Sequence, residues 1–139
     1  MNKILAKVSA IESVDNLSVI SFEANKQQLC LMALGLNFEL HVGSEVYLSA
    51  KSSNISLAKN LQAELSISNQ LTCSIISIEM GVLLCSIRLR FAQTILRSVI
   101  TKASALRMQL KLNDPIIALI KASDLSILAI KPKEGDSPL

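Results

Sequence analysis

Two stretches of the chain repeat the same order of residue types. Residues 46–56 read Val-Tyr-Leu-Ser-Ala-Lys-Ser-Ser-Asn-Ile-Ser, and residues 116–126 read Ile-Ile-Ala-Leu-Ile-Lys-Ala-Ser-Asp-Leu-Ser, at an offset of 70. A second pair, residues 2–12 and 69–79, lines up at an offset of 67, and each member begins with Asn and ends with Ile-Glu. The two offsets indicate tandem units, with three extra residues in the second unit between its paired segments.

The repeat divides the chain into a first unit over residues 1–60 and a second over residues 65–131, joined by a short link. Residues 132–139 belong to a proline- and charge-rich end and are expected to form a flexible tail. A unit of roughly 60 residues buries only about 60% of the surface of its unfolded chain, so each unit is marginal alone. We therefore expect the units to pair and the chain to form oligomers.

Most of the sequence is typical of short strands. In residues 17–23 and 82–90 apolar residues alternate with small polar or charged ones, and this period of two predicts strands. Only residues 101–110 favour a helix, with Thr101 as the N-cap. The predicted fold class is all-β, with two tandem small β-barrels that each contain a short helix at most. One continuous β-sandwich with an accidental repeat is the alternative.

The composition excludes several classes of protein. Half of the 139 residues are hydrophobic, but no run approaches the roughly 20 apolar residues of a membrane-spanning helix, and residues 1–7 lack an apolar signal region. We therefore expect a cytoplasmic protein without membrane insertion. The three cysteines (Cys30, Cys73 and Cys85) have no close spacing, so neither a disulfide framework nor a zinc site is predicted.

Catalysis and nucleic-acid binding are also disfavoured. The net charge is +3 without a basic run, and the chain has only four aromatic residues to stack on bases. The single histidine, His41, lies between apolar neighbours, and no glycine-rich phosphate loop is present. We expect no enzymatic activity and no nucleic-acid partner.

Three segments of the second unit resemble one known family. Residues 66–71 (Ser-Ile-Ser-Asn-Gln-Leu) resemble the Ser-Ala-Arg-Asn-Gln-Leu opening of Mop domains, the transport-associated OB-fold (TOBE) modules of molybdate-binding proteins. Residues 99–104 resemble the family's Ile-Thr-x-x-Ser segment, and residues 116–129 are close to its Val-x-Ala-Leu-Ile-Lys-Ala-Ser-Asp strand. The first unit is a weaker relative. It keeps Asn2 and residues 51–54. At an offset of 70, however, Leu31 and Leu34 stand at the positions of the Thr and Ser of the Ile-Thr-x-x-Ser segment.

The resemblance implies a tandem-Mop protein of two OB-like barrels, similar to the small cytoplasmic molbindins. Such proteins bind molybdate or tungstate between Mop units of different subunits, for storage, homeostasis or sensing. We expect a homotrimer, with a dimer as alternative, and no cofactor besides the oxyanion. The alternative function is a non-binding assembly module associated with a molybdate or tungstate transporter or regulator.

The resemblance also implies which residues bind the oxyanion. Ser66 and Asn69 are assigned to one side of the interface, and the other side comprises Thr101, Ser104, Lys121, Ala122 and Ser123. In the first unit, Lys51 and Ser52 are expected to form a second, different kind of site. These types suit a tetrahedral dianion, which presents only hydrogen-bond acceptors and requires converging donors. The family's arginine is replaced by Ser68, which leaves Lys121 as the main positive charge of the assigned set.

Overall fold

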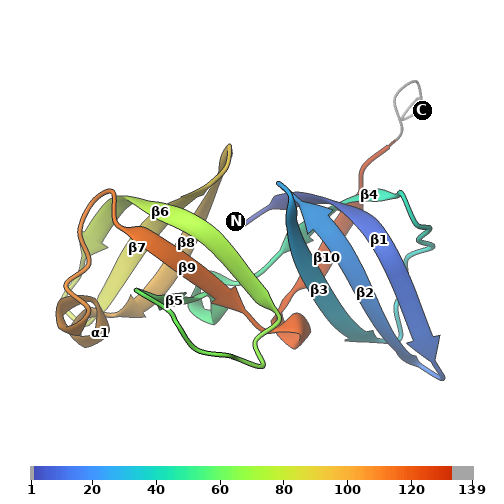
Figure 1. Ribbon diagram of the computed structural model, residues 1–139, viewed down its shortest axis with the longest axis horizontal. Helices are drawn as coiled ribbons and strands as arrows, with labels where there is room; N and C mark the ends of the chain where they lie inside the picture. Colours follow the sequence, from blue (N-terminus) through green and yellow to red (C-terminus); the bar gives the residue numbers. More distant parts are fainter. Residues whose placement is uncertain (1, 133–139) are drawn as a thin grey trace.

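Ten strands form two five-stranded antiparallel sheets in the computed structural model, which describes residues 2–132 (Figure 1). The first sheet has the order β10-β4-β1-β2-β3 and the second β5-β9-β6-β7-β8. The strands are β1 (Ile4–Val14), β2 (Leu17–Ala24), β3 (Gln27–Leu34), β4 (Glu45–Ser49), β5 (Ser56–Ala58), β6 (Asn69–Met80), β7 (Leu84–Phe91), β8 (Thr94–Thr101), β9 (Pro115–Ile120) and β10 (Ser126–Ile130). One helix, α1 (Lys102–Arg107), and two short 3-10 turns, η1 (Ser52–Asn54) and η2 (Ala122–Asp124), connect them.

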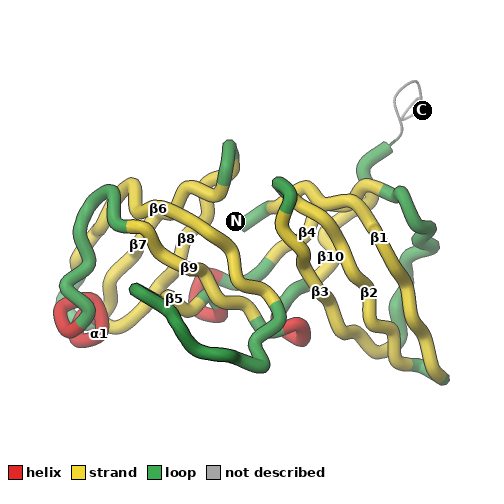
Figure 2. The backbone as a smooth tube through the Cα atoms, in the orientation of Figure 1, coloured by secondary structure: helices red, strands yellow, loops and turns green. Residues whose placement is uncertain are grey.

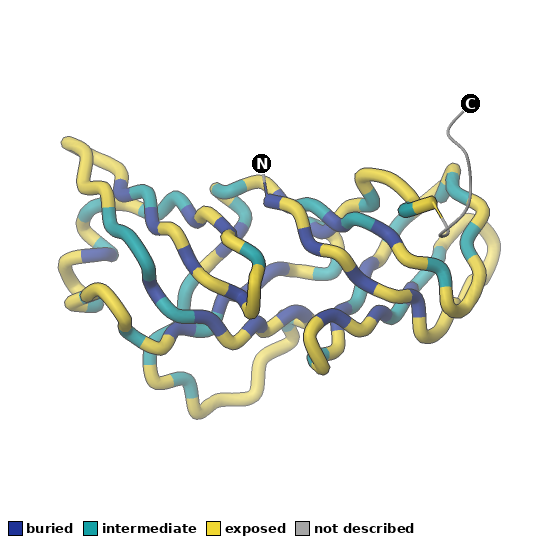
Figure 3. The backbone as a smooth tube through the Cα atoms, turned by 90° about the horizontal axis from the view of Figure 1, so that it is seen from above, coloured by how far each residue is buried: buried dark blue, intermediate teal, exposed yellow. Residues whose placement is uncertain are grey.

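The alternating sequence pattern corresponds to one buried face in each sheet. In β7, Cys85, Ile87, Leu89 and Phe91 are buried, and the residues between them are half-buried or exposed. The same alternation of buried and exposed backbone runs along other strands in Figure 3. Each sheet curls around its apolar face, so the predicted all-β fold of two tandem small barrels is confirmed.

The two units exchange their last strands. The chain leaves β4 of the first sheet through η1 and pairs β5 with β9 of the second sheet. It later leaves β9 through η2 and pairs β10 with β4 of the first sheet. The sheets therefore do not follow the predicted units 1–60 and 65–131, since each takes a strand from the other part of the chain. Residues 133–139 of the predicted tail lie outside the described residues.

The strand registers give the internal alignment of the two units. Leu17 pairs with Leu34 in the first sheet and Leu84 with Thr101 in the second, so an offset of 67 holds as far as the end of β3 and β8. Ten residues (35–44) then lead to β4, but thirteen (102–114) lead to β9. The expected placement of Leu31 and Leu34 by an offset of 70 was therefore wrong for both residues. Leu34 and Asn37 correspond to Thr101 and Ser104, and the three extra residues lie in the connection that contains α1.

Helix α1 is shorter than the predicted helix over residues 101–110, but it begins as predicted. Thr101 is extended, and its side chain accepts a hydrogen bond from the Ser104 N–H at 3.1 Å, as an N-cap does. Gln109 has a φ of 52°, a left-handed conformation that ends helices. Ala105 is buried and attaches the helix to the hydrophobic core.

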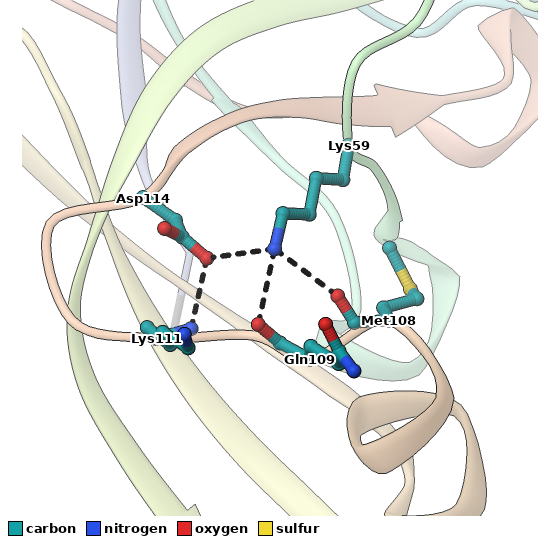
Figure 4. A network of polar contacts seen from close by, with 5 residues as sticks. All are labelled: Lys59, Met108, Gln109, Lys111 and Asp114. Carbon is teal, nitrogen blue, oxygen red and sulfur yellow. Dashed lines mark hydrogen bonds and ion pairs between the residues drawn. The ribbon is translucent and has the colours of Figure 1, made fainter.

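A polar cluster attaches the chain after β5 to the second unit (Figure 4). The Lys59 ammonium donates to the Met108 and Gln109 carbonyls at 3.2 and 3.0 Å and lies 3.3 Å from the Asp114 carboxylate. Asp114 also accepts a hydrogen bond from the Lys111 N–H at 2.9 Å. The exchanged strand and the connection after α1 are therefore held together. Figure 2 shows the loop after β5 passing below the second sheet on its way to β6.

Candidate functional site

Two buried asparagines hold the seams between the sheets. Asn2 donates from Nδ2 to the carbonyls of Ala50 (3.0 Å) and Arg97 (3.1 Å), and its Oδ1 accepts from the Arg97 N–H at 2.6 Å. Asn69 donates to the carbonyls of Ile120 (3.0 Å) and Cys30 (2.9 Å) and accepts from the Cys30 N–H at 2.7 Å. Each asparagine thus joins its own unit to the edge strand of the other, and the two sets of bonds match at offsets of 67 and 70.

The position of Asn69 bears on its predicted contact with an oxyanion. Its exposed fraction is 0%, and both its amide oxygen and its amide nitrogen form hydrogen bonds with backbone groups of the same chain. A buried amide that lost these partners would leave backbone groups unsatisfied. In this structure Asn69 therefore stabilises the seam beneath the surface rather than facing solvent.

Ser66 and the segment Lys121–Ser123 lie at one end of the second sheet. Asn69 pairs with Ile120, so the residues before β6 and those after β9 emerge beside each other. Ser66, Lys121 and Ser123 are exposed, and Ala122 is half-buried in η2. The strands end here because the chain turns through η2 toward the first sheet, and Ser123 borders a depression beside β3.

Thr101 and Ser104 lie at the opposite end of that sheet. Thr101 pairs with Leu84, close to the turn that joins β6 to β7. Lys121 directly follows Ile120, which pairs with Asn69 at the start of β6. The 12 residues of β6 separate the two ends, a path of roughly 36 Å at about 3.3 Å per residue. Within one chain, Thr101 and Ser104 are therefore too far from Lys121, Ala122 and Ser123 to share a ligand.

Apolar side chains surround Thr101. Val82, Leu83, Leu84 and Leu106 are among the most exposed hydrophobic residues of the chain, and with Thr101 they line one shallow depression. Thr101 Oγ1 donates to Ser104 Oγ at 2.9 Å, and Arg107 also donates to that Ser104 oxygen at 3.2 Å. The end of the sheet that bears these hydroxyls thus combines polar donors with uncovered apolar surface.

Lys51 and Ser52 lie at the other seam, at the start of η1. Lys51 is exposed, and Ser52 is half-buried and accepts a hydrogen bond from Asn2 Nδ2 at 3.3 Å. Ser52 lines a cavity with Asn2 and two arginines, Arg88 and Arg97. Sequence reasoning did not single out these arginines, although the alternation in β7 predicts that Arg88 and Arg90 face outward.

Other chemistry finds little support in the described residues. Within residues 2–132, no three His, Cys, Asp or Glu side chains are placed to share a metal ion. Burial raises the pKa of the Cys73 thiol to about 11 and also raises the pKa of Cys85, which disfavours the thiolate forms of both. No helix formed by residues 2–132 is long and apolar enough to cross a membrane.

Comparisons with known proteins relate this architecture to one family. Residues 65–127 match the family model of the TOBE domain. The structure of the cytoplasmic molybdate-binding protein ModG, with molybdate bound, is similar to the chain with a TM-score of 0.85 and 23% sequence identity, covering 91% of this chain and 94% of that one. A molybdate-binding protein from Sporomusa ovata is 27% identical with a TM-score of 0.47, covering 48% of this chain and 98% of that one. No curated protein sequence matches the chain.

Proposed function

We propose, from the match of residues 65–127 to the TOBE domain model, that the protein binds molybdate or tungstate in the cytoplasm without catalysing a reaction. The oxyanion lies at interfaces between units of different copies, in a homotrimer or, as the alternative, a dimer. Storage, homeostasis and sensing are the roles that fit such a site. The molybdate-bound protein ModG has the same tandem fold, which supports this assignment.

The separation of the predicted donors carries the proposal. Thr101 and Ser104 lie at one end of the second sheet, and Ser66 and Lys121–Ser123 lie at the other. A site that uses both groups requires a second copy of the chain. The exposed apolar residues beside Thr101 would become buried in such an interface, which favours association.

The donor chemistry also fits an oxyanion. Lys121 contributes an ammonium, and Ser66 and Ser123 contribute exposed hydroxyls. Bonds from such groups to a charged acceptor are roughly twice as strong as bonds between neutral groups. Asn69 takes the role of a positioning residue, since it fixes the start of β6 against the end of β9 beneath Ser66 and Lys121.

A second function, that of a non-binding assembly module for a transporter or regulator, is favoured by two substitutions. Ser68 replaces the arginine of the family's opening motif, and Leu34 occupies the place of Thr101 in the first unit. Both remove donors from the predicted sites. The apolar surface would then contact a different protein rather than a second copy.

Calorimetry and light scattering test these alternatives together. Titration with molybdate and with tungstate should give heat, and light scattering should report an oligomer at micromolar concentration. The variants Lys121→Ala and Thr101→Val should each weaken binding by about tenfold, the loss of one charge-assisted contact. Lys26→Ala, an exposed lysine in the β2–β3 turn, is the matched control. A monomer would overturn the interface site, and an oligomer without heat would favour the assembly module.

A further inference from the structure

A cavity of about 350 Å³ lies at the seam that Asn2 holds, between η1 and strands β7 and β8 of the second sheet. Its lining is mainly polar and consists of Asn2, Ser52, Arg88, Ile95, Leu96 and Arg97. The contact between η1 and β8 forms it, so both units contribute to its wall within one chain. It is separate from Thr101 and Lys121, neither of which lines it.

Two positive charges face each other in this cavity. Arg88 of β7 and Arg97 of β8 are direct cross-strand partners, and both are exposed. Like charges directly opposite each other in a sheet are destabilising. Within residues 2–132, neither guanidinium forms an ion pair with a carboxylate. Glu79 borders a neighbouring depression together with Arg97 but makes no ion pair with it. The chain described here therefore leaves this charge uncompensated.

The polar neighbours of the arginines are already fixed. Asn2 bonds to both the N–H and the carbonyl of Arg97, which immobilises the backbone at that position. Ser52 Oγ accepts from Asn2, so its own hydroxyl proton is available to a ligand in the cavity. Two guanidiniums and one hydroxyl form a donor set that suits the acceptor oxygens of an anion.

The other seam lacks this donor set. At an offset of 67, Ser21 and Cys30 correspond to Arg88 and Arg97, and they pair with each other in the same register. At an offset of 70, Ala122 corresponds to Ser52. The framework of the seams does not require arginines, because the Asn69 seam forms without them. The pair is a local addition to the Asn2 seam.

We propose that this cavity binds a tetrahedral oxyanion between Arg88, Arg97 and Ser52, as a second site contained in a single chain. It accepts phosphate, sulfate or molybdate, since all present the same arrangement of acceptor oxygens. Binding offsets the repulsion between the two arginines and ties η1 of the first unit to the second sheet. This site does not rest on the proposed oligomer interface.

Titration calorimetry with inorganic phosphate, sulfate and molybdate tests the site, together with thermal melting in each ligand. Wild type should bind one ion per chain here, and each ion should raise the melting temperature. The double variant Arg88→Gln, Arg97→Gln should bind at least about tenfold more weakly and lose the ligand-induced shift in melting temperature. Its melting temperature without ligand should be equal to or above that of wild type, because a like-charge pair is removed.

Arg90→Gln is the matched control, since Arg90 is the neighbouring exposed arginine of β7 but pairs with Ile95 and does not line the cavity. An equal loss of affinity in Arg90→Gln would overturn the proposal in favour of diffuse surface charge. Unchanged binding by the double variant would also overturn it. The Lys121→Ala, Thr101→Val protein separates the two proposals. It should keep the ion bound by the arginines, and loss of all ions in that protein would assign every ion to the interface and remove this site.

Discussion

The two seams of the molecule share a framework but differ in the surface above it. Asn2 and Asn69 make matching bonds to the neighbouring unit, yet two arginines overlie the Asn2 seam where Ser21 and Cys30 overlie the other. The asparagine bonds are therefore the same at both seams, while the residues beside them differ: Arg88 and Arg97 are exposed, and Ser21 and Cys30 are half-buried. Chemistry can change at a seam without altering the contact that holds the sheets together.

Removal of the asparagine at the seam without arginines should have the largest effect. Asn69→Ala leaves the Cys30 N–H and the Cys30 and Ile120 carbonyls without partners. Since each unsatisfied buried group costs about 1–3 kcal/mol, we expect a loss of about 3–4 kcal/mol in the free energy of unfolding. Urea denaturation measures it, with the exposed Asn37→Ala as the control. A loss below about 1 kcal/mol would show that the Asn69 bonds do not hold this seam.

The same substitution at the other seam should cost less. Asn2→Ala removes bonds to Ala50, Ser52 and Arg97, but the polar cavity beside it allows water to replace some of them. We expect a loss of about 2 kcal/mol in the same urea experiment. An effect equal to that of Asn69→Ala would mean that the cavity does not relieve the freed groups.

A buried hydroxyl distinguishes the two edge strands. Ser98 has an exposed fraction of 0% and donates to the Ile55 carbonyl at 2.6 Å, whereas its counterpart is Leu31, which makes no such bond. Ser98→Ala should destabilise the protein by about 1–1.5 kcal/mol, since one buried carbonyl loses its donor. The urea midpoint should fall with an unchanged m-value. An unchanged midpoint would show that the Asn2 seam tolerates an apolar residue at this position as well as the Asn69 seam does.

The smallest effect should concern the turns that precede β4 and β9. Asp114 accepts from the Lys111 N–H and contacts Lys59, and Ser44 accepts from the His41 N–H at the matching place. The Lys111 bond, followed by the Lys59 contacts, lowers the pKa of Asp114. The stabilisation is thus present above the carboxyl's unfolded pKa and is lost as the pH falls through its lower folded pKa.

The variant Asp114→Ser places a serine before β9, as Ser44 stands before β4. Urea midpoints measured from pH 7 to pH 3 should decline less in this variant than in wild type, because the variant has no carboxylate to protonate at this position. Glu39→Gln, which alters an exposed carboxylate near the first turn, is the control. Identical pH profiles for Asp114→Ser and wild type would contradict the assignment.

The sequence predicted the strands and the repeat because both depend on local patterns. Alternation marks the strands, and the matched segments mark the units. The exchange of β5 and β10 was not predictable, since three residues such as Ser56–Ala58 carry no signal for which sheet they join. Helix α1 stops short of residue 110 because Gln109 adopts a left-handed conformation that a helix-forming composition does not reveal.

The candidate site was predictable in part. Thr101 is an N-cap as its position suggested, and Asn69 was singled out by its motif. Its burial against Cys30, however, depends on a contact between residues 39 positions apart. The outward direction of Arg88 follows from the strand pattern, but its partner Arg97 follows only from the register of the β7–β8 hairpin. These parts of the site depend on contacts between residues that are distant in the sequence, and local sequence patterns do not predict such contacts.

The exchange of strands gives the chain the geometry of a domain-swapped dimer whose two halves have been fused end to end. Residues 59–68 are the covalent tether between them. A short tether holds its ends at an effective concentration in the millimolar range, far above that of free chains in dilute solution. The swap itself is therefore a unimolecular event whose completion does not depend on how much protein is present. A single repeat expressed alone would instead have to find a partner, and its folding would vary with concentration.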